Sequence, residues 1–134
     1  MRKINKAIIH CTATREGEDK TVADIRAMHL KRNWSDIGYH FLITLNGTVE
    51  VGRPIEKPGA HTKGENLDSI GIAYVGGVEE DGRTPKDTRT LEQKEALRWL
   101  ISDLKGKYDF DQVDPHNKYA NKACPCFDVY AEEY

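Results

Sequence analysis

The sequence has no long apolar run and no excess of one charge. Its 134 residues hold 20 Lys and Arg against 22 Asp and Glu, a formal net charge of -2 at pH 7. This balance offers no general attraction to nucleic acid or to an anionic membrane, so we expect neither as a partner. No window approaches the roughly 20 apolar residues of a membrane span, and residues 7–9 are too short a run for a signal-peptide core. We expect a soluble protein made in the cytoplasm without a signal peptide.

Cysteine is scarce as well. The three cysteines, Cys11, Cys124 and Cys126, are too few and odd in number for a disulfide framework, so reduced thiols or thiolate ligands are expected. Internal repeats, low-complexity tracts and linkers are also missing. A chain of this length with 38% apolar residues suits one domain, residues 1–134, around one core.

Apolar spacing and turn residues predict an alternation of strands and helices. Residues 6–11 are apolar on both alternating sets, as in a strand covered on both faces. Helices are expected over residues 21–33 and 91–107, because Thr21 with Asp24 and Thr90 with Gln93 resemble capping boxes.

A hairpin and two further strands complete the expected fold. Asn46-Gly47 joins two β-rich runs and predicts a type I′ turn, and strands are expected over residues 69–77 and 112–114. The order of these elements predicts an α/β fold with a single mixed central sheet flanked by helices.

The segment "DPHNKYANKACPCFD", residues 114–128, gathers polar and sulfur side chains without helical or strand periodicity. A catalytic zinc site takes three ligands from His, Cys and carboxylates and leaves a fourth position open. His116 and Cys124 on this segment, with His10 at the end of the first strand, are residue types that could form such a site. Each residue alone also has an ordinary structural explanation, and the spacing does not decide between the two.

Four motifs together carry a resemblance to a known family: "IIHCTAT", "GYHFLITLNGTVEVGR", "GAHTKGENLDSIGIAYVGG" and "KACPCFD". In this order they resemble the N-acetylmuramoyl-L-alanine amidases of the bacteriophage T7 lysozyme type, whose fold is shared with peptidoglycan recognition proteins. The resemblance implies a zinc hydrolase with one Zn²⁺ per chain, in a surface cleft at one edge of the sheet. It implies peptidoglycan as substrate, cut between N-acetylmuramic acid and L-alanine of the stem peptide by zinc-bound water.

Carried over by position, the resemblance assigns His10, His116 and Cys124 as zinc ligands and Tyr39 and Lys122 as catalytic residues. Lys122 suits stabilisation of the negative charge that builds on the carbonyl oxygen. Tyr39 has three roles open to it: orienting the water, holding the tetrahedral oxygen, or assisting proton transfer to the leaving amine.

Substrate contacts are expected from the loop after the hairpin. The resemblance places His61 in the wall of the cleft as a substrate contact, and Asn66 beside it as a further contact or a brace. The segment around His116 lacks the Gly-His-Arg motif common in relatives. Lys118 is a candidate replacement for that arginine.

The remaining histidines and cysteines have structural roles in this interpretation. His29 and His40 are expected to be structural, and Cys11 alternates away from His10 along its strand. Cys126 is expected to be a thiol outside the ligand set, although a fourth or alternative ligand stays open.

Two other functions fit parts of the pattern. A non-catalytic peptidoglycan-binding module would share the fold, but such modules typically lack the zinc cysteine that Cys124 provides here. A structural zinc protein would need a closed four-ligand site, for which only Cys126 is available. The enzyme interpretation places the protein at the cell wall after lysis or release, and no sequence feature tests for a regulatory protein partner.

Overall fold

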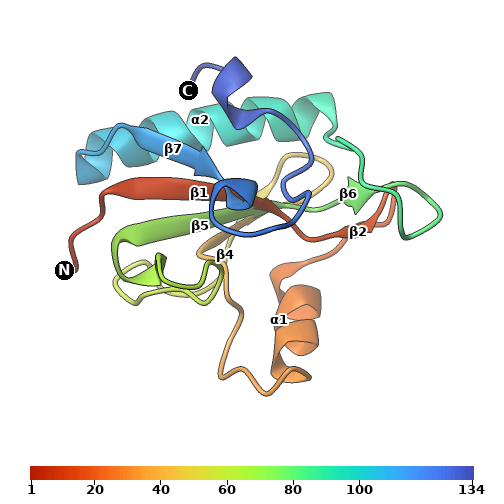
Figure 1. Ribbon diagram of the computed structural model, residues 1–134, viewed down its shortest axis with the longest axis horizontal. Coiled ribbons are helices and arrows are strands. Elements are labelled where there is room, and N and C mark those ends of the chain that lie inside the picture. Colours follow the sequence, from red (N-terminus) through yellow and green to blue (C-terminus); the bar gives the residue numbers. More distant parts are fainter.

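The computed structural model describes residues 1–134 and centres on a five-stranded sheet of order β4-β3-β5-β1-β7 (Figure 1). Its strands are β1 (Lys6–Cys11), β3 (Phe41–Ile43), β4 (Val49–Val51), β5 (Ser69–Tyr74) and β7 (Gln112–Pro115). Three neighbour pairs are parallel and only β3–β4 is antiparallel, which confirms a mixed sheet. A separate parallel pair, β2 (Thr14–Arg15) with β6 (Gly77–Val78), was not predicted.

Both predicted helices form, each with its predicted capping box. Helix α2 spans Leu91–Tyr108, as expected, whereas α1 spans Val22–Leu30 and ends before residue 33. Asn33 has a φ of 64°, a left-handed conformation that asparagine tolerates but a helix cannot continue through. The structure also contains three short 3₁₀ helices: η1 (Asn66–Asp68), η2 (His116–Lys118) and η3 (Val129–Ala131).

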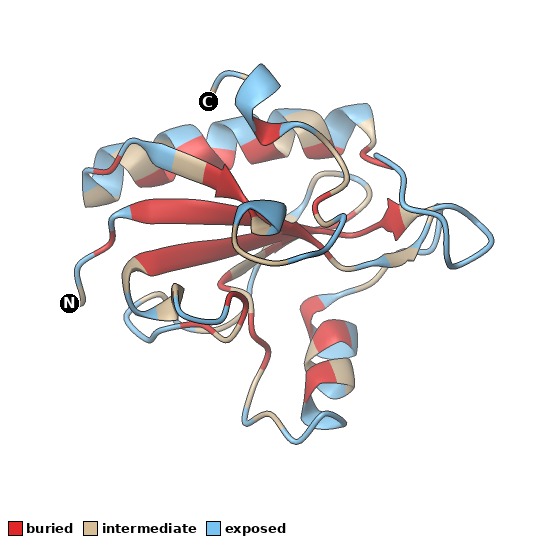
Figure 2. Cartoon of the chain, viewed as in Figure 1, coloured by how far each residue is buried: buried red, intermediate tan, exposed pale blue.

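The sheet buries apolar side chains on both faces. Ile43 packs into the larger core cluster with α2, whereas its neighbour Leu42 packs with Val22 and Ile25 of α1. The two helices therefore cover opposite faces, and β1 is buried along its whole length, as predicted (Figure 2). Because side chains alternate along a strand, His10 points to the face opposite the one that Cys11 shares with α2.

The β3–β4 hairpin is confirmed, but the predicted type I′ turn is wrong. That turn needs positive φ at both central residues, and Gly47 alone has it, at 85°. The Gly47 N–H donates to the Thr44 carbonyl, so the loop is a tight turn closed by a left-handed glycine. A side chain at residue 47 would lie 2.8 Å from the Glu92 carbonyl oxygen, so the turn also needs glycine where it approaches α2.

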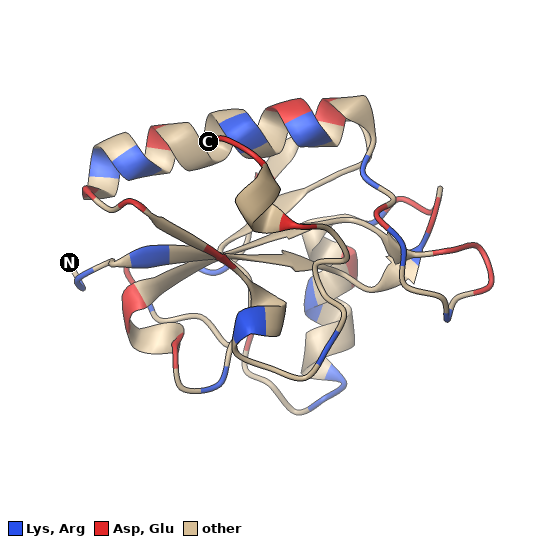
Figure 3. Ribbon diagram, turned by 45° about the horizontal axis from the view of Figure 1, so that its top comes forward, with Lys and Arg blue, Asp and Glu red and all other residues tan.

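Charged residues of both signs alternate along the outer face of α2 and through the surrounding loops (Figure 3). Such a mixed surface agrees with the formal net charge of -2. Neither helix combines the length and apolar character needed to cross a membrane.

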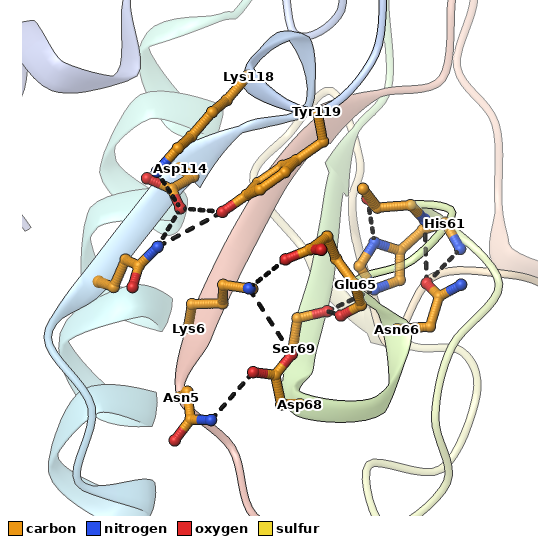
Figure 4. Close-up of polar contacts among 12 residues, drawn as sticks. Asn5, Lys6, His61, Glu65, Asn66, Asp68, Ser69, Asp114, Lys118 and Tyr119 are labelled. Atoms are coloured by element: carbon orange, nitrogen blue, oxygen red, sulfur yellow. Dashed lines mark hydrogen bonds and ion pairs between the residues drawn. The ribbon is translucent and has the colours of Figure 1, made fainter.

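A buried carboxylate fixes the end of β7. Asp114 is 2% exposed, and its oxygens accept hydrogen bonds from the side chains of Gln112 (2.6 Å) and Tyr119 (2.6 Å) (Figure 4). The Tyr130 hydroxyl donates a third, at 2.8 Å. Lys118 adds an ion pair at 3.5 Å. Burial acts to raise the pKa of Asp114, but these donors and the Lys118 charge outweigh it and lower the pKa. The carboxylate thus ties the segments around η2 and η3 to β7, two residues before His116.

Asp114→Asn should destabilise the protein by about 1.5–3 kcal/mol at neutral pH, because hydrogen bonds to a charged acceptor are lost. A lowered folded-state pKa stabilises the fold above the unfolded value of about 4, and this stabilisation disappears as pH falls through the folded value. The gap in unfolding midpoint between wild type and variant should therefore narrow below about pH 4. Thermal unfolding of the metal-free proteins across this range measures it.

Asp103→Asn is the matched control, since Asp103 pairs with Lys107 on the exposed surface of α2. It should follow the wild type at every pH. A gap for Asp114→Asn that stays constant down to pH 3 would contradict the proposed role of its charge.

Candidate metal centre

Three metal-ligating side chains from distant segments meet at the carboxyl end of β1. His10 is on β1, His116 begins η2 directly after β7, and Cys124 lies in the C-terminal segment that crosses this end of the sheet (Figure 1). Their donor atoms all lie within 4.8 Å of one another. The two imidazole centroids are 4.4 Å apart. The structure thus brings together the three residues predicted as ligands.

Strand pairing explains why the histidines meet. β1 and β7 are parallel, with Ile9 opposite Pro115, so His10 and His116 are the next residues on the two strands. Ligand sites of open α/β sheets commonly lie beyond the carboxyl ends of parallel strands. The Cys11 backbone N–H then donates to Cys124 Sγ at 3.1 Å and brings the thiol to the same end.

The protonation states suit metal binding. Burial is the main cause that lowers the pKa of His10 well below 6.5, followed by the charges of His61, His116 and Lys122. Burial and Lys122 also lower the pKa of His116. Both imidazoles are therefore neutral at neutral pH, and a neutral imidazole has the lone pair that a metal requires.

The two C-terminal thiols differ. Hydrogen bonding from the Cys11 thiol is the largest cause that lowers the pKa of Cys124, together with the Cys11 amide and the Lys122 charge, against burial. Hydrogen bonding with Cys11 and burial instead raise the pKa of Cys126. Cys126 is also outside the three-residue donor cluster. This supports the prediction that Cys124, and not Cys126, is a ligand.

One buried polar atom of the cluster is left unsatisfied by the protein. His116 Nδ1 is the single buried side-chain nitrogen or oxygen without a hydrogen-bond partner. Leaving such an atom unpaired costs free energy, and native structures rarely do so. A metal ion held by this nitrogen, His10 and Cys124 would satisfy it, so the residues present fit a metal.

The two predicted catalytic residues lie on either side of the cluster. The Tyr39 ring is 5.3 Å from that of His10, centroid to centroid, and its hydroxyl donates weakly to the Cys11 carbonyl at 3.4 Å. Burial, with the nearby Cys124 and Cys11, raises the pKa of Tyr39, so the phenol stays protonated at neutral pH. Lys122 is exposed and lines a cleft that also contains His116.

This cleft has a volume of about 490 Å³. Ten residues line it: Trp34, Ala60, His61, Thr62, Lys63, Asn66, His116, Tyr119, Ala120 and Lys122. Trp34 was missed, because a single tryptophan in a polar loop has no periodicity that would assign it to a binding site. Lys118, the expected replacement for a family arginine, does not line the cleft and instead pairs with Asp114.

The loop that carries His61 is braced from within. The Asn66 side-chain oxygen accepts the backbone N–H groups of His61 and Thr62, each at 3.0 Å (Figure 4). His61 is only 9% exposed, and both of its ring nitrogens lie within reach of protein side chains. Substrate contact by His61 and Asn66 stays a prediction.

The other buried histidines have structural partners. His29 Nδ1 accepts the Gly38 amide at 2.9 Å, and His40 Nδ1 accepts the Gly71 amide at 3.0 Å. Cys11 is part of the core on the α2 face. All three were predicted to lie outside the ligand set, and the donor cluster excludes them.

Comparison with known proteins gives one consistent result. The family model of N-acetylmuramoyl-L-alanine amidase matches residues 1–127. The endolysin of Escherichia phage T7 is 40% identical over 121 residues, which cover 90% of this chain and 80% of that protein. Among solved structures, the N-acetylmuramoyl-L-alanine amidase LysC from Clostridium intestinale URNW aligns with a TM-score of 0.77 and 29% identity, over 94% of this chain and 78% of that chain.

A second solved structure, wild-type Drosophila PGRP-LB, aligns with a TM-score of 0.80 and 26% identity, over 98% of this chain and 79% of that chain. Sequence and fold therefore agree over nearly the whole length. The chain belongs to the N-acetylmuramoyl-L-alanine amidase family.

Proposed function

We propose that His10, His116 and Cys124 hold one Zn²⁺ per chain, and that this centre serves the reaction of the family. That reaction hydrolyses the amide bond between N-acetylmuramic acid and the L-alanine of the peptidoglycan stem peptide. The unpartnered Nδ1 of His116, buried among two other ligand-type side chains, is the observation that carries the proposal. We infer that residues 1–134 act as one domain, since Val129 packs in the same core cluster as Ile9.

The donor set favours zinc over other common metals. Two imidazoles and a thiolate are ligands for zinc or other transition metals, whereas Mg²⁺ and Ca²⁺ prefer oxygen. Three protein ligands leave one position of a tetrahedral zinc open, as catalytic sites do. The closed four-ligand site of a structural zinc protein would need Cys126, which lies outside the donor cluster.

Zinc, when bound, supplies a Lewis acid that lowers the pKa of coordinated water toward ~7 and polarises a carbonyl group. The other contributions to catalysis come from side chains of the protein. Lys122, in the cleft beside His116, stabilises the negative charge that develops on the substrate carbonyl oxygen. Because this charge exists only in the transition state, the interaction accelerates the reaction instead of only tightening binding.

Tyr39 acts as a hydrogen-bond donor. Its raised pKa argues against a phenolate base at neutral pH, and its weak 3.4 Å contact with the Cys11 carbonyl leaves the hydroxyl free to turn toward a ligand. The donor roles are to hold the tetrahedral oxygen or to orient the attacking water. Assistance to the leaving amine requires the same protonated form.

Non-catalytic binding of peptidoglycan is the alternative function on this fold. Solved structures of peptidoglycan recognition proteins share this fold. The convergence of Cys124, Tyr39 and Lys122 around the histidine pair supports hydrolysis, because a binding module needs none of these three groups in this arrangement.

We infer that the protein reaches its substrate after lysis or release from the cytoplasm. The T7 relative is an endolysin, and peptidoglycan is the substrate of the family reaction. Neither α1 nor α2 meets the requirements of a membrane span, which agrees with this route.

The activity has a direct test. Purified protein should contain about one zinc per chain and release stem peptides with new alanine amino termini from peptidoglycan. Chelation should abolish release, and added zinc should restore it. Mass spectrometry of the digested muropeptides identifies the bond. A fully zinc-loaded protein that generates no alanine amino termini from peptidoglycan of any source would rule out the proposed reaction.

Lys122→Ala should lower kcat/KM by about 10²–10³-fold, because one charge-stabilising group is removed from the transition state. Its zinc content should stay at the wild-type level, measured by atomic emission on the purified protein. Lys107→Ala, on the exposed surface of α2, is the control and should keep full activity. Loss of zinc from the Lys122 variant would contradict the assigned role.

The two cysteines should respond differently to substitution by serine. Cys124→Ser removes a thiolate ligand and should weaken zinc binding by more than about tenfold. Cys126→Ser should retain one zinc per chain, because Cys126 lies outside the donor cluster. Competition with a chromogenic chelator measures both affinities. Equal loss in both variants would place Cys126 among the ligands.

A further inference from the structure

His61 contacts a proposed metal ligand through its ring. Its Nδ1 lies 2.9 Å from His10 Nε2, and the two rings meet edge to face, 88° apart in orientation. This contact was not expected from the sequence, in which His61 is a candidate substrate contact. A hydrogen bond between these two nitrogens needs a proton on only one of them. The position of that proton therefore decides which ring nitrogen of His10 keeps a lone pair for a metal.

The neighbours of His61 locate the proton. The Ser69 hydroxyl donates to the Glu65 carbonyl oxygen at 2.7 Å, so its single hydrogen is already used. Ser69 Oγ is also 3.3 Å from His61 Nε2, and at this contact it can only accept (Figure 4). His61 therefore carries its proton on Nε2. In a neutral imidazole this leaves Nδ1 as an acceptor.

An acceptor at His61 Nδ1 requires a donor at His10 Nε2. The proton of a neutral His10 then resides on Nε2, and His10 Nδ1, which has no hydrogen-bond partner in the protein, keeps its lone pair. We propose that His61 is a positioning residue that holds His10 in this tautomer and so leaves Nδ1 free to bind the metal. This inference rests on the proposed function, because it assigns His61 a task toward the same zinc centre.

The His61 ring is held firmly enough for this task. Asn66 fixes the backbone on both sides of the Cα–C bond by accepting the N–H groups of His61 and Thr62. The ring lies against the backbone of β5, where a Cβ atom on Gly71 would be 2.5 Å from His61 Cδ2. Partners that orient a metal-bound histidine typically change metal affinity or activity by 10–100-fold when removed.

The two proposed histidine ligands differ in how far protein contacts orient their rings. His116 has no protein partner on either ring nitrogen, and its ring lies at the wall of the cleft. His10 is 1% exposed and depends on the protein for orientation. The chain from the Glu65 carbonyl through Ser69 and His61 to His10 thus prepares one ligand, while the metal itself must orient the other.

Long-range proton–nitrogen NMR correlations of the histidine rings in the metal-free protein test the proposal. Wild-type His10 and His61 should both be protonated on Nε2 at neutral pH. A wild-type His10 protonated on Nδ1 would overturn the proposal. Because no zinc is present, this result is independent of metal binding and activity.

Variants supply the second measurement. His61→Phe keeps a ring but removes the acceptor, so the Nε2 proton of His10 should redistribute and zinc affinity should fall by about 10–100-fold. His61→Asn offers an oxygen acceptor near the place of Nδ1 and should recover most of the affinity. His29→Phe, which removes another buried imidazole that lies outside the donor cluster, is the control and should keep both the tautomer and the affinity.

Wild-type affinity in a folded His61→Phe variant would overturn the proposal, as would equal losses in His61→Phe and His29→Phe. Thermal unfolding of the metal-free variants establishes that they fold, and the wild-type NMR result stands if they do not. A wild-type protein that binds no zinc would contradict the proposed function, while the tautomer of His10 would still decide the role of His61.

Discussion

The parallel pairing of β1 with β7 places two histidines from opposite ends of the chain at one edge of the sheet. The C-terminal segment then crosses that edge, where the Cys11 amide reaches Cys124 across 113 residues of sequence. Closing loops of this length costs conformational entropy, which burial of β1 and β5 on both faces offsets. The proposed metal centre therefore exists only in the folded sheet, so zinc bound there and folding would stabilise each other.

Burial sets the protonation states in the same region. It lowers the pKa of His10 and His116, which keeps both imidazoles neutral, and raises the pKa of Tyr39, which keeps a donor beside them. Of the five proposed site residues only Lys122 is exposed, and it lines the cleft that also contains His116. The proposed site thus combines buried or half-buried ligands with one solvent-exposed cation.

Much of the fold could be predicted, because it depends on local patterns. Apolar residues on both alternating sets predicted the buried first strand, and capping boxes at Thr21 and Thr90 predicted both helix starts. The β2–β6 pair and the turn type at Gly47 were missed or wrong. Two-residue strands have too few side chains to show a period. Asn-Gly fits more than one turn type, and only the structure shows that Gly47 alone has a positive φ here.

The candidate site, too, could be predicted only in part. The donor residues follow from motif order, and the structure brings them together. Neither the contact between His61 and His10 nor the hydrogen bonds that Asp114 accepts could be predicted. Such pairs depend on which atoms of distant segments meet in the fold. A single histidine in a loop, or a single aspartate in a short strand, has no sequence signal that separates such a role from solvent exposure.

We propose that two imidazoles and one thiolate, from three separate segments, form one metal centre. X-ray absorption at the zinc edge, recorded on the stoichiometrically loaded protein, reports this ligand set. We expect a first shell with a single sulfur at about 2.3 Å and light atoms at about 2.0–2.1 Å, two of them from imidazole. A shell with two sulfurs, or with none, would contradict it.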